Sequence, residues 1–133
     1  MSLKPLSTAV NNPEQAFRYI RFLESRDVEE FWTLALSPKG KLLCVKMLFR
    51  GSRDQCHVDL RELLKTLVVS NATRFIVAHN HPSGDASPSE EDLRLTREIT
   101  KASKLLGFDF DDHIIVARKE YWSLKMTHEK YFY

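Results

Sequence analysis

The sequence predicts a single α/β domain in which a mixed β-sheet is flanked by helices. Three observations point to this fold class. Segments with apolar residues at helical spacing alternate with short runs rich in β-branched and aromatic residues, in the order α-β-β-α-β-α-β. The first two of these runs are joined by a short turn, whereas the later ones are separated by helices. No repeat, linker or low-complexity segment divides the 133 residues.

The first part of the chain predicts a helix followed by a β-hairpin. Asn12 and Pro13 fit a helix start, with Asn as the N-cap and Pro at the first helical position. Residues 30–36 are rich in aromatic and apolar side chains and predict a strand, and residues 41–49 predict its partner. Residues 37–40, with the sequence Ser-Pro-Lys-Gly, supply the turn between the two strands.

A second helix and a buried strand follow. Asp59 and Glu62 resemble a capping box at the start of this helix. Apolar residues then recur with the spacing of an amphipathic helix, at Leu60, Leu63, Leu64, Leu67 and Val68. Residues 74–79 form a continuous apolar run of the kind that is buried on both faces of a sheet.

The last third of the chain predicts a long helix and one or two strands. After a polar loop over residues 80–88, Ser89 opens a helix that continues to about Leu106. Its expected buried stripe consists of Leu95, Ile99, Ala102 and Leu106. Residues 108–116 predict another strand, and residues 121–124 a short last one.

Composition limits the classes of function. The chain is 43% hydrophobic and 29% charged, as in an ordinary soluble globular protein. Its net charge of +2 falls short of the strong basicity of a dedicated nucleic-acid binder. No segment is apolar enough to span a membrane or serve as a signal peptide, so we expect a cytoplasmic protein. We expect one domain over residues 13–127, between a polar lead-in (1–12) and a C-terminal tail (128–133).

The segment from His79 to Asp92 carries the chemistry. Because side chains in a strand alternate with period two, His79 and His81 at a strand end share one face. Asp92, one turn into the next helix, could be a third ligand for the same metal ion. Three protein ligands with one open position is the arrangement of catalytic rather than structural zinc.

Each part of this motif also has a structural interpretation. Ser89 and Asp92 have the spacing of a helix cap, and a His-x-His pair alone is a weak metal signal. Asp85 could stabilise its own loop or line the site. Asp112 could orient a ligating histidine, or Asp112 and His113 could be polar strand-end groups that serve the sheet. The residues alone leave these alternatives open.

Beyond single residues, the chain resembles the RadC-like branch of the JAB/MPN (JAMM) metalloprotease superfamily. The central match is His79-Asn80-His81, followed in register by Ser89 and Asp92. Four further segments resemble family motifs in the correct order, over roughly residues 15–125: Glu29-Glu30-Phe31, Phe49-Arg50-Gly51-Ser52, Arg61-Glu62 and Asp112-His113-Ile114-Ile115. The resemblance implies a JAB/MPN-like fold, related in outline to cytidine deaminases, in a short form without the N-terminal helix-hairpin-helix region.

The resemblance also implies an activity and its residues. His79, His81 and Asp92 would bind Zn²⁺, and Glu29 would exchange protons with the water at the metal. Glu30, its neighbour, would point to the other face of the strand. Ser89 would help to hold the oxyanion. The expected reaction is hydrolysis of a peptide or isopeptide amide bond in a peptide or protein substrate.

Three rival functions were weighed against this one. A DNA-repair factor or nuclease acting on nucleic acid is possible, although the charge does not support it. A zinc deaminase needs a Pro-Cys-x-x-Cys ligand pair, which the sequence lacks. A non-catalytic scaffold would have no need of the complete set of site residues. The sequence predicts neither the substrate nor the oligomeric state.

Overall fold

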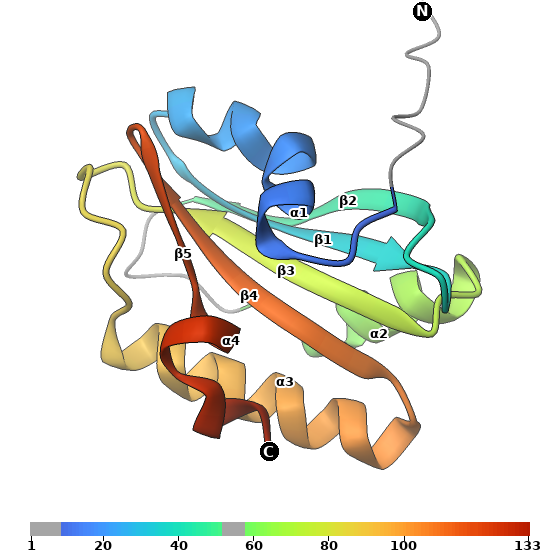
Figure 1. Cartoon of the computed structure of the whole chain (residues 1–133). Helices are drawn as coiled ribbons and strands as arrows, with labels where there is room; N and C mark the ends of the chain where they lie inside the picture. The colour runs from blue at the N-terminus through green and yellow to red at the C-terminus, as the bar shows by residue number, and fades with distance from the viewer. Residues whose placement is uncertain (1–8, 52–57) are drawn as a thin grey trace, which may run out of the picture.

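A five-stranded mixed sheet forms the centre of the molecule (Figure 1). Its strands are β1 (Glu29–Leu36), β2 (Leu42–Gly51), β3 (Arg74–Asn80), β4 (Asp109–Ala117) and β5 (Glu120–Ser123). They lie in the order β2-β1-β3-β4-β5. The pair β3–β4 is parallel and the other three pairs are antiparallel, which confirms the predicted mixed sheet.

The computed structural model describes residues 9–51 and 58–133. Most of the expected lead-in, and Ser52 of the family-like turn motif, therefore lie outside the described residues. The helices are α1 (Pro13–Ile20), η1 (Arg21–Ser25), α2 (Leu60–Val69), α3 (Glu90–Leu106), α4 (Leu124–Thr127) and η3 (Glu129–Phe132), where η marks a 3-10 helix. The sequence did not predict α4, η1 or η3.

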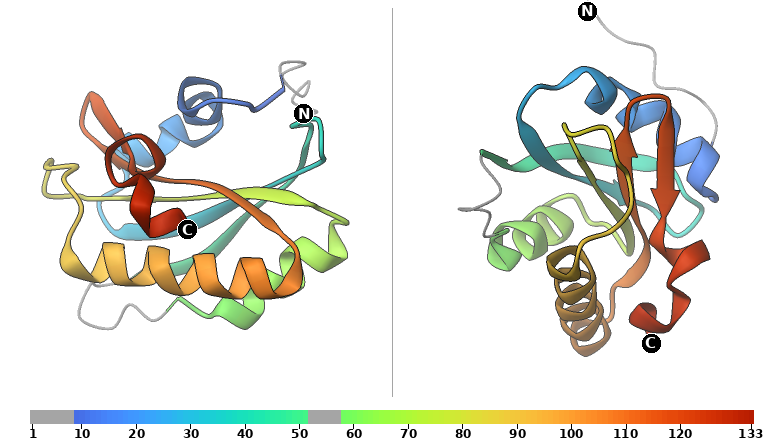
Figure 2. Two further views of the ribbon diagram at one scale, coloured as in Figure 1. Left: turned by 60° about the horizontal axis from the view of Figure 1, so that its bottom comes forward. Right: turned by 90° about the vertical axis from the view of Figure 1, so that its left-hand side faces the viewer.

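The helices cover both faces of the sheet, as Figure 2 shows. On one face, Ala16, Ile20 and Leu23 of α1 and η1 pack against alternate residues of the three central strands, such as Leu34, Ile76 and Ile114. On the other face, Leu63 and Leu67 of α2 and Ile99 of α3 pack against the intervening residues, such as Phe31, Phe75 and Val77. Strand β3 is therefore buried on both sides, as expected, and its odd-numbered residues face α2 and α3.

Local caps fix where the helices begin and end. The side chains of Asn12 and Asp59 accept hydrogen bonds from backbone N–H groups of the first turns of α1 and α2. Ser89 and Asp92 form a complete capping box at the start of α3. The helix ends at Gly107, whose φ of 81° is a left-handed conformation that glycine adopts without strain.

The buried stripe predicted for α3 is confirmed only in part: Ile99 is buried and Leu95 packs against the core, but Ala102 is only half-buried. Leu106 is 54% exposed, and the residues that face the core are Asp92, Thr96, Ile99, Thr100 and Ser103. The hydroxyl groups of Thr96, Thr100 and Ser103 donate hydrogen bonds of 2.6–2.8 Å to carbonyl oxygens one turn earlier. These polar side chains are therefore buried with their donors paired.

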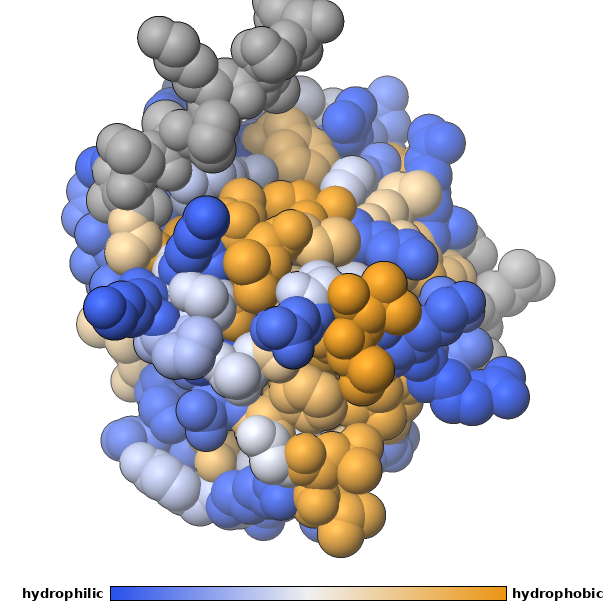
Figure 3. Space-filling model, turned by 90° about the vertical axis from the view of Figure 1, so that its right-hand side faces the viewer, coloured by the Kyte–Doolittle hydropathy of each residue, from blue (hydrophilic) through white to orange (hydrophobic). Residues whose placement is uncertain are grey.

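An apolar surface covers the ends of α2 and α3, on the face drawn in Figure 3. Four apolar side chains are exposed there: Val68, Val69, Leu105 and Leu106. The sequence pattern had placed Val68 and Leu106 in the core. This face lies at the opposite end of the sheet from the loop that follows β3 (Figure 1).

Residues near both proposed domain limits take part in the core. Val10 is fully buried, and its N–H donates to the carbonyl oxygen of Gly40. Phe132 is buried against Phe110, with ring centroids 4.9 Å apart. The limits at residues 13 and 127 remain a prediction. Within the described part of the chain, no helix has the length and apolar character needed to cross a membrane.

The carboxylate of Asp112 connects β4 to β5 and α4. It accepts hydrogen bonds from the hydroxyl of Ser123 and from the backbone N–H groups of Lys125 and His113. Burial raises the pKa of Asp112 to about 6 from its ordinary value of 3.8, and these hydrogen bonds only partly oppose the increase. Ionisation of Asp112 is therefore less favourable in the folded protein than in the unfolded chain.

This pKa predicts how stability changes with pH. Between pH 4 and 6 the folded protein keeps a proton that the unfolded chain releases, so the free energy of unfolding falls as the pH rises through this window. The loss approaches about 3 kcal/mol above pH 6. Asp112→Asn keeps the acceptor oxygen but cannot ionise, so it should remove this loss.

Urea denaturation of wild type and Asp112→Asn from pH 4 to pH 8 measures the effect. We expect the variant to gain stability relative to wild type as the pH rises, and exposed Asp109→Asn to serve as the control. A difference between the Asp112→Asn protein and wild type that does not change with pH would contradict the prediction.

Candidate metal centre

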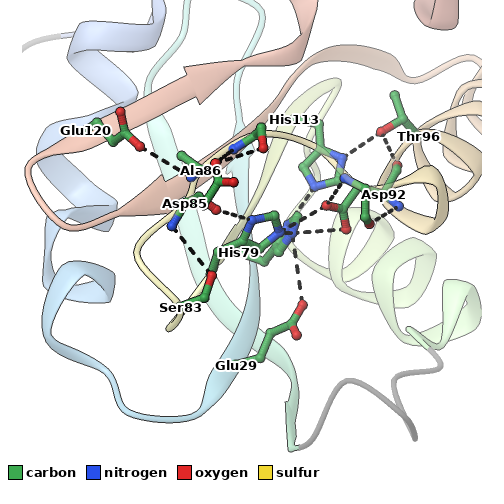
Figure 4. Close-up of polar contacts among 12 residues, drawn as sticks. Glu29, His79, Ser83, Asp85, Ala86, Asp92, Thr96, His113 and Glu120 are labelled. Carbon is green, nitrogen blue, oxygen red and sulfur yellow. Dashed lines mark hydrogen bonds and ion pairs between the residues drawn. The ribbon is translucent and has the colours of Figure 1, made fainter.

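Three buried side chains meet at one end of the sheet (Figure 4). His79 lies at the end of β3 on the face toward α3, and its ring stacks on that of Phe31 with centroids 5.7 Å apart. His81 follows directly after β3, where its N–H donates to the carbonyl oxygen of Val116. Asp92 projects from the first turn of α3. Each residue offers one ligand atom within 4.8 Å of the others, so this group could hold a metal ion.

The distances within the cluster suit a small ion. His79 Nε2 lies 3.0 Å from His81 Nε2 and 3.2 Å from Asp92 Oδ1. His81 Nε2 lies 3.0 Å from Asp92 Oδ2. Ligand atoms around a tetrahedral zinc ion, with bonds of about 2.0–2.1 Å, lie about 3.3 Å apart. The side chains therefore need to move by only a few tenths of an ångström to bind such an ion.

The hydrogen bond of His81 leaves its Nε2 atom facing a carboxylate, an arrangement that a bound cation would stabilise. Its Nδ1 lies 2.8 Å from the carbonyl oxygen of Asp85, which can only accept, so Nδ1 carries the proton. In a neutral ring the lone pair is then on Nε2, which faces the carboxylate of Asp92. Two acceptors at 3.0 Å repel each other unless a cation is present, either a second proton on the ring or a metal ion.

A chain of hydrogen bonds fixes His79 in the same tautomer. Thr96 Oγ1 donates to the carbonyl oxygen of Asp92 at 2.8 Å and therefore accepts from His113 Nδ1, 2.7 Å away. His113 Nε2 is left to accept from His79 Nδ1 at 2.8 Å. Burial, and then the nearby His79, lowers the pKa of His113 well below its ordinary value, which keeps this ring neutral. The Nε2 lone pair of His79 is thus directed at the cluster.

These contacts correct the interpretation in which Asp112 orients a ligating histidine. Asp112 lies on the opposite face of β4, where it bonds Ser123 and the start of α4. The neighbouring residue His113 faces the cluster instead, because side chains alternate along the strand. The sequence marked the pair as a candidate, but Thr96 gave no signal of its own.

Asp92 combines a capping role with its place in the cluster. Its Oδ2 accepts from the N–H of Ser89 at 3.0 Å, and its own N–H donates to Ser89 Oγ at 3.1 Å. Burial alone would raise the pKa of Asp92, but hydrogen bonds that His79 and His81 donate when a second proton occupies their Nε2 atoms outweigh burial and hold this pKa well below its usual range. The carboxylate is therefore ionised. Ser89 is a helix cap, as its structural interpretation required.

Glu29 and Glu30 point to opposite faces of β1. Glu29 Oε1 lies 4.0 Å from His79 Nε2. Glu30 Oε1 accepts from the indole N–H of Trp32 at 2.9 Å. Asn80, between the two histidines, holds this part of β1 in place: its Oδ1 accepts from the N–H of Glu30 at 2.7 Å, and its Nδ2 donates to the carbonyl oxygen of Val28 at 3.1 Å. No pattern in the sequence indicated this role of Asn80.

The cluster borders open space. A cleft of about 520 Å³ lies beside it and is lined by residues that include Glu29, Gly51, His81 and Pro82. The carboxylate of Glu29 and the ring of His81 thus stand between the buried cluster and a groove open to solvent. Asp85 is not among the residues that line this cleft, and its carboxylate accepts from the N–H and hydroxyl of Ser87. It acts as a loop-stabilising residue through these bonds.

Several curated proteins are similar to this chain. UPF0758 proteins of Porphyromonas gingivalis (38% identical over 113 residues), Syntrophomonas wolfei (35% over 127) and Methanosarcina acetivorans (40% over 110) match 84%, 94% and 83% of it. The matches cover 50%, 54% and 48% of those proteins, so the chain spans about half of their length.

A family model for the RadC-like JAB domain matches residues 10–130. This range contains all five strands and the complete His-His-Asp cluster. The chain therefore belongs to the RadC-like JAB domain family.

Proposed function

We propose that this protein is a zinc-dependent hydrolase in which water attacks a peptide or isopeptide amide bond of a peptide or protein substrate. One observation carries the proposal: two imidazole Nε2 atoms and a carboxylate converge on one point, beside a second carboxylate at the edge of an open cleft. Membership of the JAB domain family supports it, because domains of this superfamily are often hydrolytic.

His79, His81 and Asp92 would hold the metal ion. Two imidazoles and one carboxylate favour zinc over magnesium or calcium, which prefer ligand sets made of oxygen alone. When bound, zinc lowers the pKa of a water molecule to about 7 and polarises a carbonyl group. The Nδ1 protons of both histidines are held by acceptors, so each ring presents only a lone pair to the ion.

Glu29 is suited to move the proton of the attacking water. Its carboxylate lies at the cleft, 4.0 Å from a ligand nitrogen of His79, where it can accept a proton and later deliver it to a leaving amine. The neighbour Glu30 has no access to this point because its carboxylate pairs with Arg26 and Arg50 on the other face of β1.

Ser89 is suited to stabilise the oxyanion. Capping uses an oxygen lone pair of Ser89, which accepts from the N–H of Asp92, and leaves the hydroxyl proton for donation. A donor directed at charge that develops only in the transition state contributes on the order of 3 kcal/mol in comparable sites. The capping role and the catalytic role are therefore compatible.

The zinc assignment is tested by elemental analysis of purified wild type and His81→Ala. We expect about one zinc ion per chain in wild type and a large loss in the variant, with circular dichroism to show that the variant folds. Equal, negligible metal in both proteins after incubation with zinc would favour a non-catalytic scaffold instead.

Thr96→Val should weaken zinc binding, although the side chain of Thr96 would not contact the ion. The valine leaves the Nδ1–H of His113 without an acceptor and so loosens the tautomer of His79. We expect zinc affinity to fall by roughly 10–100-fold, the usual cost of losing an outer partner of a ligand. Competition with a chromophoric chelator measures the affinity.

Thr100→Val is the matched control, one turn further along α3. The hydroxyl of Thr100 bonds the carbonyl oxygens of Thr96 and Tyr131, and neither of these bonds involves a histidine. It should lose stability but retain the affinity for zinc. An equal loss of zinc affinity in both variants would show that helix packing, rather than the hydrogen-bond chain, is responsible.

Glu29→Gln should abolish hydrolysis while zinc remains bound, because the amide cannot take the water proton. We expect the rate to fall by roughly 10²–10⁴-fold, the usual contribution of general acid–base catalysis. A proteome-derived peptide library, incubated with zinc-loaded protein and analysed for new amino termini by mass spectrometry, provides the readout. Glu30→Gln should cleave the same peptides at nearly the wild-type rate. Full activity of Glu29→Gln would remove Glu29 from the mechanism.

A further inference from the structure

The β4–β5 hairpin touches the loop that carries the metal motif. At the start of β5, Glu120 Oε1 accepts a hydrogen bond from the N–H of Ala86 at 3.3 Å. The carbonyl oxygen of Asp85 accepts from His81 Nδ1 at 2.8 Å. This carbonyl and this N–H belong to the same peptide group, so a continuous path runs from the Glu120 carboxylate through one peptide plane to His81 (Figure 4).

The orientation of this peptide group decides the tautomer of His81. With the carbonyl toward the ring, as observed, Nδ1 must carry the proton and Nε2 is free to bind a metal ion. If the peptide group were reversed, its N–H would face Nδ1, which would then have to accept. The ring proton would move to Nε2, and His81 could no longer offer that atom as a ligand.

We propose that Glu120 is a positioning residue of the metal centre: its carboxylate holds the Asp85–Ala86 peptide group in the orientation that keeps His81 protonated on Nδ1. A carboxylate can only accept hydrogen bonds, so it favours the orientation that presents the N–H and disfavours the reversed one, which would present a carbonyl oxygen. The role in metal binding rests on the proposed function, whereas the effect on the tautomer does not.

The other residues of the loop do little to hold the Asp85–Ala86 peptide group in its orientation. Four residues of the loop are exposed: Pro82, Ser83, Asp85 and Ser87. The carboxylate of Asp85 bonds Ser87 rather than the Asp85–Ala86 peptide group. Ala86, in contrast, is fully buried against the end of β4 and the C-terminal core. The β4–β5 hairpin therefore holds His81 at two points. Glu120 of β5 bonds the peptide group that contacts the ring, and the carbonyl oxygen of Val116 in β4 accepts from the N–H of His81.

Acceptor geometry, rather than charge, should dominate the effect. The Glu120 residue is exposed and its hydrogen bond, at 3.3 Å, is longer than the usual 2.9–3.0 Å, so solvent screens its negative charge. A neutral acceptor of the same length should therefore serve nearly as well. Glu120→Gln removes the negative charge but keeps an acceptor oxygen, whereas Glu120→Ala removes both. A comparison of the two variants therefore separates the two contributions.

The test combines zinc affinity with nitrogen NMR of His81. In metal-free Glu120→Ala we expect the ¹⁵N signals of His81 to show a mixture of tautomers, whereas wild type and Glu120→Gln show Nδ1–H alone at a pH where the ring is neutral. Chelator competition should give about 10-fold weaker zinc binding for Glu120→Ala and no more than about 3-fold for Glu120→Gln. Glu91→Ala, which removes an exposed carboxylate from the first turn of α3, controls for charge.

The outcomes separate this inference from the proposed function. If wild type binds zinc and Glu120→Ala matches it in both affinity and tautomer, the positioning role is wrong and the metal site stands. If wild type binds no zinc, the proposed function fails, and the NMR comparison alone decides the role of Glu120. An equal loss of affinity in Glu120→Ala and Glu120→Gln would assign the effect to charge and overturn the geometric mechanism.

Discussion

One constraint organises the site: His79 and His81 must both keep their proton on Nδ1, so that their Nε2 atoms can meet at a single point. Each ring has its own acceptor, and each acceptor is held by a different part of the fold. For His79 this acceptor is His113 of β4, which is backed by Thr96 of α3. For His81 it is a carbonyl group of the loop between β3 and α3.

This constraint explains why position 96 on the buried face of α3 is polar. A leucine at position 96 would pack well in an ordinary core but would leave His113 without an acceptor for its proton. The threonines and the serine of this face pair their hydroxyls with the preceding turn of the helix, which offsets the cost of burying them. At position 96, packing and chemistry thus select the same small hydroxyl side chain.

The parts of the site that follow local rules could be predicted from the sequence. Strand alternation places His79 beside His81, and helix capping places Asp92 in the first turn of α3. Glu29 was found only through the resemblance to a family, because no local pattern connects it to residues 50 positions later. Asn80 and Thr96 were missed because their roles depend on hydrogen bonds between elements that are far apart in the sequence. The stripe of α3 was predicted only in part, because a buried row of hydroxyl groups has the same sequence pattern as a solvent-exposed face.

The capping box of Ser89 and Asp92 also bears on how such a domain can change during evolution. At the third position of α3, asparagine would lose the favourable negative charge at the helix start, worth about 0.3–1 kcal/mol, but its oxygen could still accept from the N–H of Ser89. One nucleotide change could therefore remove a carboxylate ligand and leave the architecture intact. For the proposed hydrolase, loss of catalysis in a lineage would then come at little cost in folding, and the inactive copy could persist long enough to acquire a purely binding role.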